Sequence, residues 1–203
     1  MSARIYKLLY GIGFTPWENP KSQGGSGEQV SAMFDREESG RQPPYGSALD
    51  LGCGRGRFTV ELARRGWQVT GVDIVPKAVS GARERAREAG VEVRLVEADV
   101  ASLTTEEVGS DFRLVLDFGT VHGIRDEDRA AVGRLVSQVA TADATLLIFA
   151  FAPGRRGPSP RGMSREDIEA TYPGWRVTDE SPADVNLPGI LKADPHWYRL
   201  RRD

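Results

Sequence analysis

Short apolar segments alternate with stretches of helical periodicity along most of the chain. Strand-like apolar runs occupy residues 47–51, 67–73, 91–99, 112–119 and 144–152. The stretches between them predict helices over residues 56–66, 76–90 and 126–141. Pro76 stands at a predicted helix start, and Gly66 and Gly90 stand at predicted helix ends. Strands that alternate with helices are typical of crossover units and a parallel sheet, so we expect an α/β fold.

The two ends of the chain carry different patterns. Residues 153–167 form a loop rich in Pro, Gly and Arg that leads into a short helix, and residues 174–180 and 196–202 predict two strands that pair as a terminal hairpin. At the other end, Ile5, Leu8, Leu9 and Ile12 recur at helical spacing, and a second helix is predicted around residues 28–38. We expect one domain, with residues 1–46 as an N-terminal helical cover and residues 47–203 as the core.

A glycine-rich turn follows the first predicted strand, in the stretch "ALDLGCGRGR". Such a turn exposes backbone N–H groups at a helix N-terminus, where polar parts of a ligand bind. Gly52, Gly54 and Gly56 give the spacing G-x-G-x-G, and Arg57 stands where the dinucleotide fingerprint has its third glycine. Asp50 would repel a pyrophosphate but attract a cationic ammonium group. The turn therefore disfavours a nicotinamide cofactor and favours a cationic ligand.

Further acidic residues follow the next two predicted strands. Asp73 lies 21 positions after Gly52, where a carboxylate can accept hydrogen bonds from both hydroxyls of a ribose. Asp99 can accept from an adenine amino group, while the N–H of Val100 donates to a ring nitrogen. Because ligands of open α/β sheets bind at the carboxyl ends of the strands, these positions indicate a nucleoside.

The stretches "LDLGCGRGRF", "GVDI" and "EADV" resemble the first three motifs of the class I S-adenosylmethionine-dependent methyltransferases. The resemblance covers residues 47–151 well and the last fifty residues loosely. It implies a Rossmann-like, doubly wound, mostly parallel seven-stranded sheet with an antiparallel last strand. It also implies S-adenosylmethionine as cofactor and S-adenosylhomocysteine as product. The cofactor-binding positions it implies are Asp50, Gly52, Cys53, Gly54, Gly56, Asp73, Ile74, Asp99, Val100, Asp117 and Phe118.

Two further stretches, "VLDFGTVHGI" and "FTPWE", resemble the small-molecule branch related to thiopurine and tellurite-resistance methyltransferases. Here the chain departs from the pattern, because the segment after Trp17 is richer in glycine than that branch leads us to expect. We predict that residues 15–46 form a lid that orders when cofactor and acceptor are both bound.

The acceptor side offers one candidate base and several candidate binding residues. His122 lies in the loop after the fourth predicted strand, and a histidine can take a proton from a hydroxyl acceptor near neutral pH. A thiolate or reduced chalcogen acceptor would need no base. Trp17, Tyr10 and Trp175 can line an acceptor pocket, as can Arg155, although core packing and a solvated basic loop are the commoner roles of such residues.

Composition limits the alternatives. The 203 residues include 27 basic and 29 acidic side chains, so no strong field attracts nucleic acid or a membrane surface. A single cysteine and the absence of an apolar run of about 20 residues favour a cytoplasmic protein. Cys53 lacks an activating neighbour in the sequence, and no metal-ligand spacing occurs.

We expect a methyltransferase that acts on a hydroxyl oxygen of a small polar acceptor, such as a phenol or a sugar. A small thiol or another chalcogen is the alternative acceptor. A non-catalytic module that only binds the cofactor and a nicotinamide-dependent oxidoreductase are the alternatives from other classes.

Overall fold

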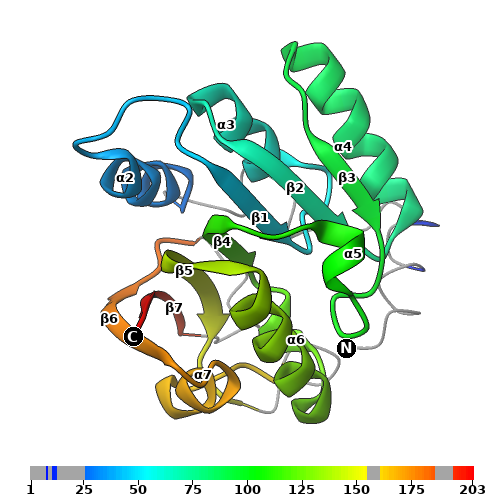
Figure 1. Ribbon diagram of the computed structural model, residues 1–203. Helices are drawn as coiled ribbons and strands as arrows, with labels where there is room; N and C mark the ends of the chain where they lie inside the picture. Colours follow the sequence, from blue (N-terminus) through cyan, green and yellow to red (C-terminus); the bar gives the residue numbers. More distant parts are fainter. Residues whose placement is uncertain (1–7, 9–10, 13–25, 155–160, 186–193) are drawn as a thin grey trace.

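The structure, a computed structural model, describes residues 8, 11, 12, 26–154, 161–185 and 194–203 (Figure 1). The described residues form one seven-stranded sheet in the order β3-β2-β1-β4-β5-β7-β6. Its strands are β1 (Ser47–Leu51), β2 (Gln68–Asp73), β3 (Arg94–Glu97), β4 (Phe112–Phe118), β5 (Ala140–Phe151), β6 (Trp175–Pro182) and β7 (Pro195–Arg202).

The register confirms the predicted sheet. β1 pairs in parallel with β2 on one side and with β4 on the other. β7 runs antiparallel to both β5 and β6, as the predicted last strand and terminal pair require. Because the chain moves outward from β1 in both directions, the carboxyl ends of β1, β2 and β4 meet at the position where such sheets bind ligands.

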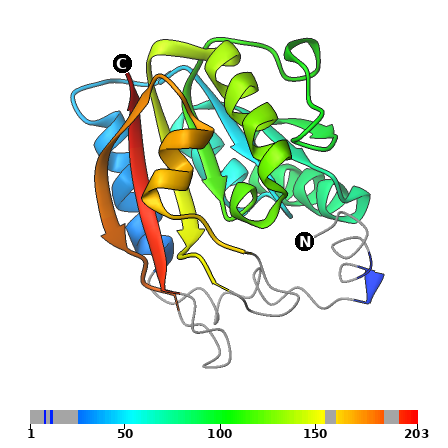
Figure 2. The same ribbon diagram turned by 90° about the horizontal axis from the view of Figure 1, so that it is seen from below.

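Helices cover both faces of the sheet, as Figures 1 and 2 show. They are α2 (Ser26–Glu38), α3 (Arg57–Arg65), α4 (Pro76–Ala89), α5 (Thr105–Val108), the 3-10 helix η3 (Val121–Gly123), α6 (Asp126–Val139) and α7 (Arg165–Thr171). Phe34 of α2 and Phe58 of α3 pack with Leu116 on one face of the sheet. Val136 of α6 and Ile168 of α7 pack with Val115 on the other. Figure 2 shows α2 and α7 on opposite sides of β5, β7 and β6.

Some element boundaries differ from the prediction. β5 begins at Ala140, directly after α6, because the residue that ends the helix already has extended backbone angles. β3 is confined to Arg94–Glu97. The short helix α5 was not predicted, although the sequence signals it: Thr104 and Glu107 form a reciprocal capping box at its start.

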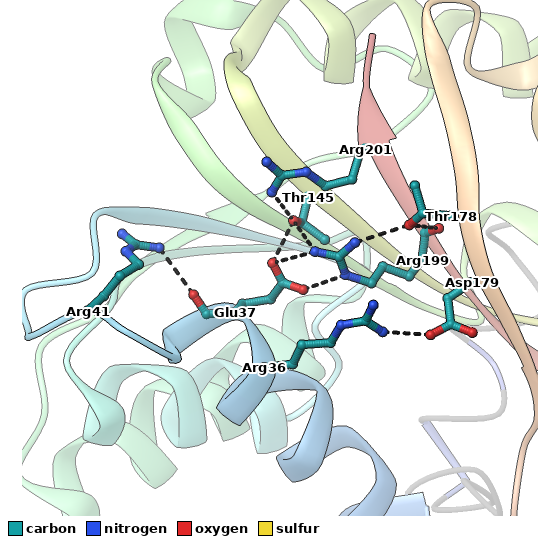
Figure 3. A network of polar contacts seen from close by, with 8 residues as sticks. All are labelled: Arg36, Glu37, Arg41, Thr145, Thr178, Asp179, Arg199 and Arg201. Atoms are coloured by element: carbon teal, nitrogen blue, oxygen red, sulfur yellow. Dashed lines mark hydrogen bonds and ion pairs between the residues drawn. The ribbon is translucent and has the colours of Figure 1, made fainter.

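A network of ion pairs and hydrogen bonds fastens α2 to the sheet (Figure 3). Arg199 of β7 donates two hydrogen bonds to the Glu37 carboxylate, at 2.6 and 3.1 Å, and the Thr145 hydroxyl donates to the same carboxylate at 2.6 Å. Arg36 pairs with Asp179 of β6 at 2.6 Å. Helix α2, which forms part of the predicted lid, is thus attached to the sheet. Residues 15–25 lie outside the described residues, and the ordering of the lid on ligand binding stays a prediction.

The helices in the described part of the chain are all too short or too polar to cross a bilayer. Leu8 and Ile12, from the predicted amphipathic N-terminal run, are exposed.

Candidate cofactor and acceptor site

The glycine-rich turn between β1 and α3 leaves no room for a side chain at Gly52 or Gly56. Gly52, Gly54 and Gly56 all have positive φ angles, of 68°, 55° and 73°, which side chains disfavour. A Cβ atom on Gly52 would lie 1.9 Å from Oγ1 of Thr120, and one on Gly56 would lie 2.9 Å from Cβ of Ala82. The turn therefore packs closely between the loop after β4 and helix α4, with its backbone facing the carboxyl ends of the strands.

Asp73, at the end of β2, holds this turn through its side chain. Its Oδ2 accepts a hydrogen bond from the N–H of Gly54 at 2.9 Å, and its Oδ1 accepts from the N–H of Val75 at 2.8 Å. An ionised carboxylate has about four acceptor positions. The Asp73 carboxylate therefore links the glycine-rich turn to the end of β2.

Asp50, at the end of β1, is almost fully buried. The hydroxyl of Thr59 on α3 donates to its Oδ2 at 2.6 Å. Burial raises the pKa of Asp50 from 3.8 to about 7, the Thr59 hydrogen bond opposes this, and the nearby charge of Asp73 adds to it. A cation placed here would favour the ionised carboxylate.

Asp117, at the end of β4, lies on the opposite face of the sheet from Asp50. Its neighbours Val115 and Val121 belong to the core under α6 and α7, whereas Asp50 faces α3. The N–H of Thr120 donates to Asp117 at 2.7 Å, and the N–H of Val121 donates to both oxygens at 3.3 and 3.2 Å. Burial raises its pKa to about 7, and the charge of Asp50 contributes. The Asp117 carboxylate thus supports the start of η3.

The other predicted cofactor residues surround these groups. Asp99 is half-buried and accepts from the N–H of Ala101 at 3.0 Å, and Val100 is buried. Ile74 is half-buried and packs in a small cluster with Val75 and Ala78. Cys53 is buried, and burial raises the pKa of its thiol well above the ordinary value, which disfavours a thiolate.

His122 is buried in η3 and packs against aromatic residues of β5. Its Nδ1 accepts a hydrogen bond from the N–H of Phe151 at 3.0 Å, and the two rings stack with centroids 4.8 Å apart. Because Nδ1 is the acceptor, the neutral ring carries its hydrogen on Nε2. Phe118, at the end of β4, stacks on Phe149 at 4.8 Å. Aromatic side chains therefore gather at the carboxyl ends of β4 and β5.

Among the remaining predicted acceptor residues, the structure describes Trp175, which lies apart from this group. Trp175 is buried at the start of β6, where it pairs with Arg202 near the amino-terminal edge of the sheet, and its indole N–H donates to Ser137. The structure gives it a packing role there, because it lies at the far edge from His122. Tyr10, Trp17 and Arg155 lie outside the described residues.

Three residues of the site escaped the sequence analysis. Thr59 donates to Asp50, and Thr120 donates from its hydroxyl to the carbonyl of Leu51 at 3.0 Å. Arg129 is buried beneath η3. A threonine three residues after a strand-end acid and directly after a glycine, as in "DFGT", is a weak local signal for Thr120. The sequence around Arg129 indicates only an acidic helix start.

The donor set fits S-adenosylmethionine. A buried carboxylate suits a cationic amino-acid end, a hydrogen-bonded carboxylate after β2 suits ribose hydroxyls, and the glycine turn lies beside both carboxylates. In the part of the chain that the structure describes, no three His, Cys, Asp or Glu side chains gather as a metal site.

Comparison with known proteins agrees with this geometry. Residues 48–142 match the family model described as a methyltransferase domain. Nearly half of the chain is therefore similar to a methyltransferase domain. A magnesium protoporphyrin IX methyltransferase from Synechocystis PCC 6803, solved with bound S-adenosylmethionine, has the same fold as this chain. Its TM-score is 0.75 and its identity 21%, over 99% of this chain and 97% of that one.

Curated proteins similar to this chain include two enzymes named for small-molecule acceptors. A ubiquinone biosynthesis O-methyltransferase from Caulobacter sp. (strain K31) is 35% identical over 62% of this chain and 52% of its own length. A 2-heptyl-1-hydroxyquinolin-4(1H)-one methyltransferase from Mycobacteroides abscessus is 30% identical over 71% of this chain and 65% of its own length. The chain thus spans about half to two thirds of these relatives. They do not single out the thiopurine and tellurite-resistance branch.

Proposed function

We propose that this protein transfers a methyl group from S-adenosylmethionine to a hydroxyl oxygen of a small, ring-bearing acceptor. The observation that carries the proposal is the convergence of Asp50, Asp73 and the glycine turn at one edge of the sheet, next to the loop that bears His122. Two relatives named for a quinone pathway and a hydroxyquinolone support an acceptor of this class.

The cofactor half of the site binds and orients. Asp50 faces the amino-acid end, Asp73 accepts from the ribose hydroxyls, and Asp99 and Val100 contact the adenine. The resemblance also assigns Cys53, Ile74, Asp117 and Phe118 to this half. When bound, S-adenosylmethionine supplies an electrophilic methyl group. The protein's task is then to align the acceptor oxygen and exclude water.

The acceptor half binds the ring and its oxygen. The rings of Phe118 and Phe151 are half-buried and offer flat apolar surface, which suits a planar acceptor. In the tautomer that the Phe151 hydrogen bond selects, Nε2 of His122 donates to the acceptor oxygen and stabilises the oxyanion that forms when the hydroxyl releases its proton to solvent water. His122 acts as the base only if this hydrogen bond breaks and Nδ1 turns toward the acceptor.

Two substitutions distinguish whether His122 acts as a hydrogen-bond donor or as the general base. Glutamine places an amide N–H near the position of Nε2, whereas alanine removes both roles. We expect His122→Ala to lower kcat/KM about 100-fold with a phenolic or quinol acceptor. If His122 is a donor, His122→Gln restores at least a tenth of the wild-type value. If His122 is the base, His122→Gln is as impaired as His122→Ala.

The assay is transfer of a labelled methyl group to panels of phenols, hydroxyquinolones, sugars and thiols, with calorimetry of S-adenosylhomocysteine in parallel. Turnover of thiols alone, unaffected by His122→Ala, would replace the oxygen acceptor with sulfur. Tight binding of S-adenosylhomocysteine without turnover on any panel would indicate a non-catalytic cofactor-binding module and overturn the proposal.

A further inference from the structure

Among the described residues, Arg129 of α6 is a buried arginine whose side chain donates several hydrogen bonds to backbone carbonyls. Its Nη2 donates to the carbonyl oxygens of His122 and of Gly162, each at 2.9 Å, and its Nε donates to the carbonyl of Val121 at 3.2 Å. Only about 6% of the residue is exposed. Arg129 also forms an ion pair with Asp126 at 3.3 Å. Because Asp126 is exposed, this pair contributes little to holding the guanidinium in place.

These contacts join two loops that leave neighbouring strands. Val121 and His122 belong to the loop after β4, and Gly162 belongs to the loop after β5. The second loop folds back on its own strand, because the N–H of Met163 donates to the carbonyl of Phe151 at 2.8 Å. A Cβ atom on Gly162 would lie 2.3 Å from the carbonyl oxygen of Ala152. The backbone is therefore packed too closely at this position for any side chain.

The contacts close into a ring. Arg129 binds the backbone of His122 and of Gly162, the next residue Met163 binds the carbonyl of Phe151, and the N–H of Phe151 binds Nδ1 of His122. The orientation and tautomer of the imidazole therefore depend on where the guanidinium holds both loops. Arginine suits this position because its planar group presents five donors in fixed directions.

We propose that Arg129 is a positioning residue for the methyl acceptor, which acts by locking the loops after β4 and β5 together and so fixing the His122 imidazole. The inference rests on the proposed function for its role in turnover, but its structural claim concerns this chain alone. It predicts that losing the guanidinium disturbs the acceptor half and leaves the cofactor half, built on β1 and β2, intact.

The structural claim is tested on the free protein by nitrogen-15 NMR of the histidine rings. The chain has two histidines, so a His122→Gln spectrum assigns the signals. We expect wild-type His122 to show one ring tautomer, with hydrogen on Nε2. In Arg129→Met the two ring nitrogens of His122 move toward an averaged value or broaden. In Arg134→Met, an exposed arginine on the same helix, they stay unchanged.

The functional claim is tested with the acceptor that the panels identify. We expect Arg129→Lys, which keeps the charge but reaches fewer carbonyls, to raise the acceptor KM at least fivefold and lower kcat. Its affinity for S-adenosylhomocysteine should stay within twofold of wild type. Arg129→Met should follow the same pattern more strongly, and Arg134→Met should match wild type.

The outcomes are distinguishable. If both Arg129 variants fold and their His122 signals match wild type, the proposal is overturned, and it is equally overturned if the affinity for S-adenosylhomocysteine falls as much as acceptor turnover. If Arg129→Met does not fold, Arg129→Lys alone decides. Absence of turnover in the wild type would remove the proposed function while the NMR result still decides whether Arg129 fixes His122.

Discussion

Asp50 and Asp117 are two buried carboxyl groups with raised pKa values, and they differ in the groups that donate hydrogen bonds to them. They end neighbouring strands, and burial raises the pKa of each to about 7. Asp117 accepts from the backbone N–H groups of Thr120 and Val121 and feels the charge of Arg129. Asp50 receives its hydrogen bonds from Thr59, through the hydroxyl and the backbone N–H, and the nearby charge that acts on it is the carboxylate of Asp73. Asp117 therefore has a cation nearby, and Asp50 has none among these groups.

The difference indicates distinct roles. A buried carboxylate with few internal donors is unfavourable in the free protein, and a cationic ligand relieves that cost. A carboxylate that receives the N–H groups of a helical turn instead stabilises the turn. We therefore expect Asp50 to matter most for ligand binding and Asp117 to matter most for stability, although the family resemblance implies a cofactor contact for both.

The largest expected effect follows from removing the charge of Asp50. Asp50→Asn keeps the size and an acceptor for Thr59, so the fold should persist. We expect the affinity for S-adenosylmethionine to fall about 30-fold, since a charged hydrogen-bonded contact contributes on the order of 2 kcal/mol. Calorimetry measures the effect, with the exposed Asp143→Asn as control. An affinity within threefold of wild type would remove the distinction between the two carboxyl groups.

Asp117→Ala tests the other side of the comparison. It leaves the N–H groups of Thr120 and Val121 without their acceptor in a buried place, so we expect the free energy of unfolding to fall by about 2 kcal/mol. For a chain of this size that lowers Tm by roughly 4–8 °C, which calorimetric melting measures. A cofactor affinity reduced as far as in Asp50→Asn, with Tm unchanged, would instead place Asp117 among the ligand-binding groups.

Stability should also depend on pH through these groups. Their pKa rises from 3.8 to about 7 on folding, so between these values the native state holds protons that the unfolded state has released. The free energy of unfolding therefore falls as pH rises toward 7 and levels off above it. Between about pH 6 and pH 8 we expect a loss on the order of 1 kcal/mol for each group. Urea unfolding of Asp50→Asn should show a smaller loss than wild type, and equal losses would contradict the assignment.

The smallest expected effect concerns the hydroxyl of Thr59, which donates a hydrogen bond to Asp50. Thr59→Val removes the donor that lowers the pKa of Asp50, so more of the carboxyl group is protonated at pH 7. We expect the affinity for S-adenosylmethionine to drop about threefold at pH 7 and to recover toward wild type at about pH 8.5, where the group is ionised again. The matched comparison is wild type in the same two buffers, and a loss that is the same at both pH values would indicate a packing effect instead.

The sequence predicts which strands carry the site, but not the side of the sheet to which each side chain points. Apolar runs and flanking glycines locate the strands, the acidic residues at their ends point to Asp50, Asp73 and Asp99, and the family resemblance adds Asp117. Strands buried on both faces lack the alternation that would reveal direction, so nothing in the sequence shows that Asp50 and Asp117 point to opposite sides.

Tertiary contacts account for what remained hidden. The sequence around Arg129 resembles any solvated helix start, since its carbonyl partners come from two loops, one of them some thirty residues away. Trp175 is indistinguishable in sequence from a pocket aromatic. Its burial against Ser137 depends on how β6 enters the sheet.

The attachment of α2 has a consequence for the nascent chain. Glu37 binds Arg199, a residue synthesised 162 positions later. Until the ribosome has released that strand, the apolar side of α2, with Val30 and Phe34, lacks the partners on β5 and β7 that bury it. Contacts so distant along the chain form slowly, so the apolar side of α2 stays exposed to solvent in the meantime.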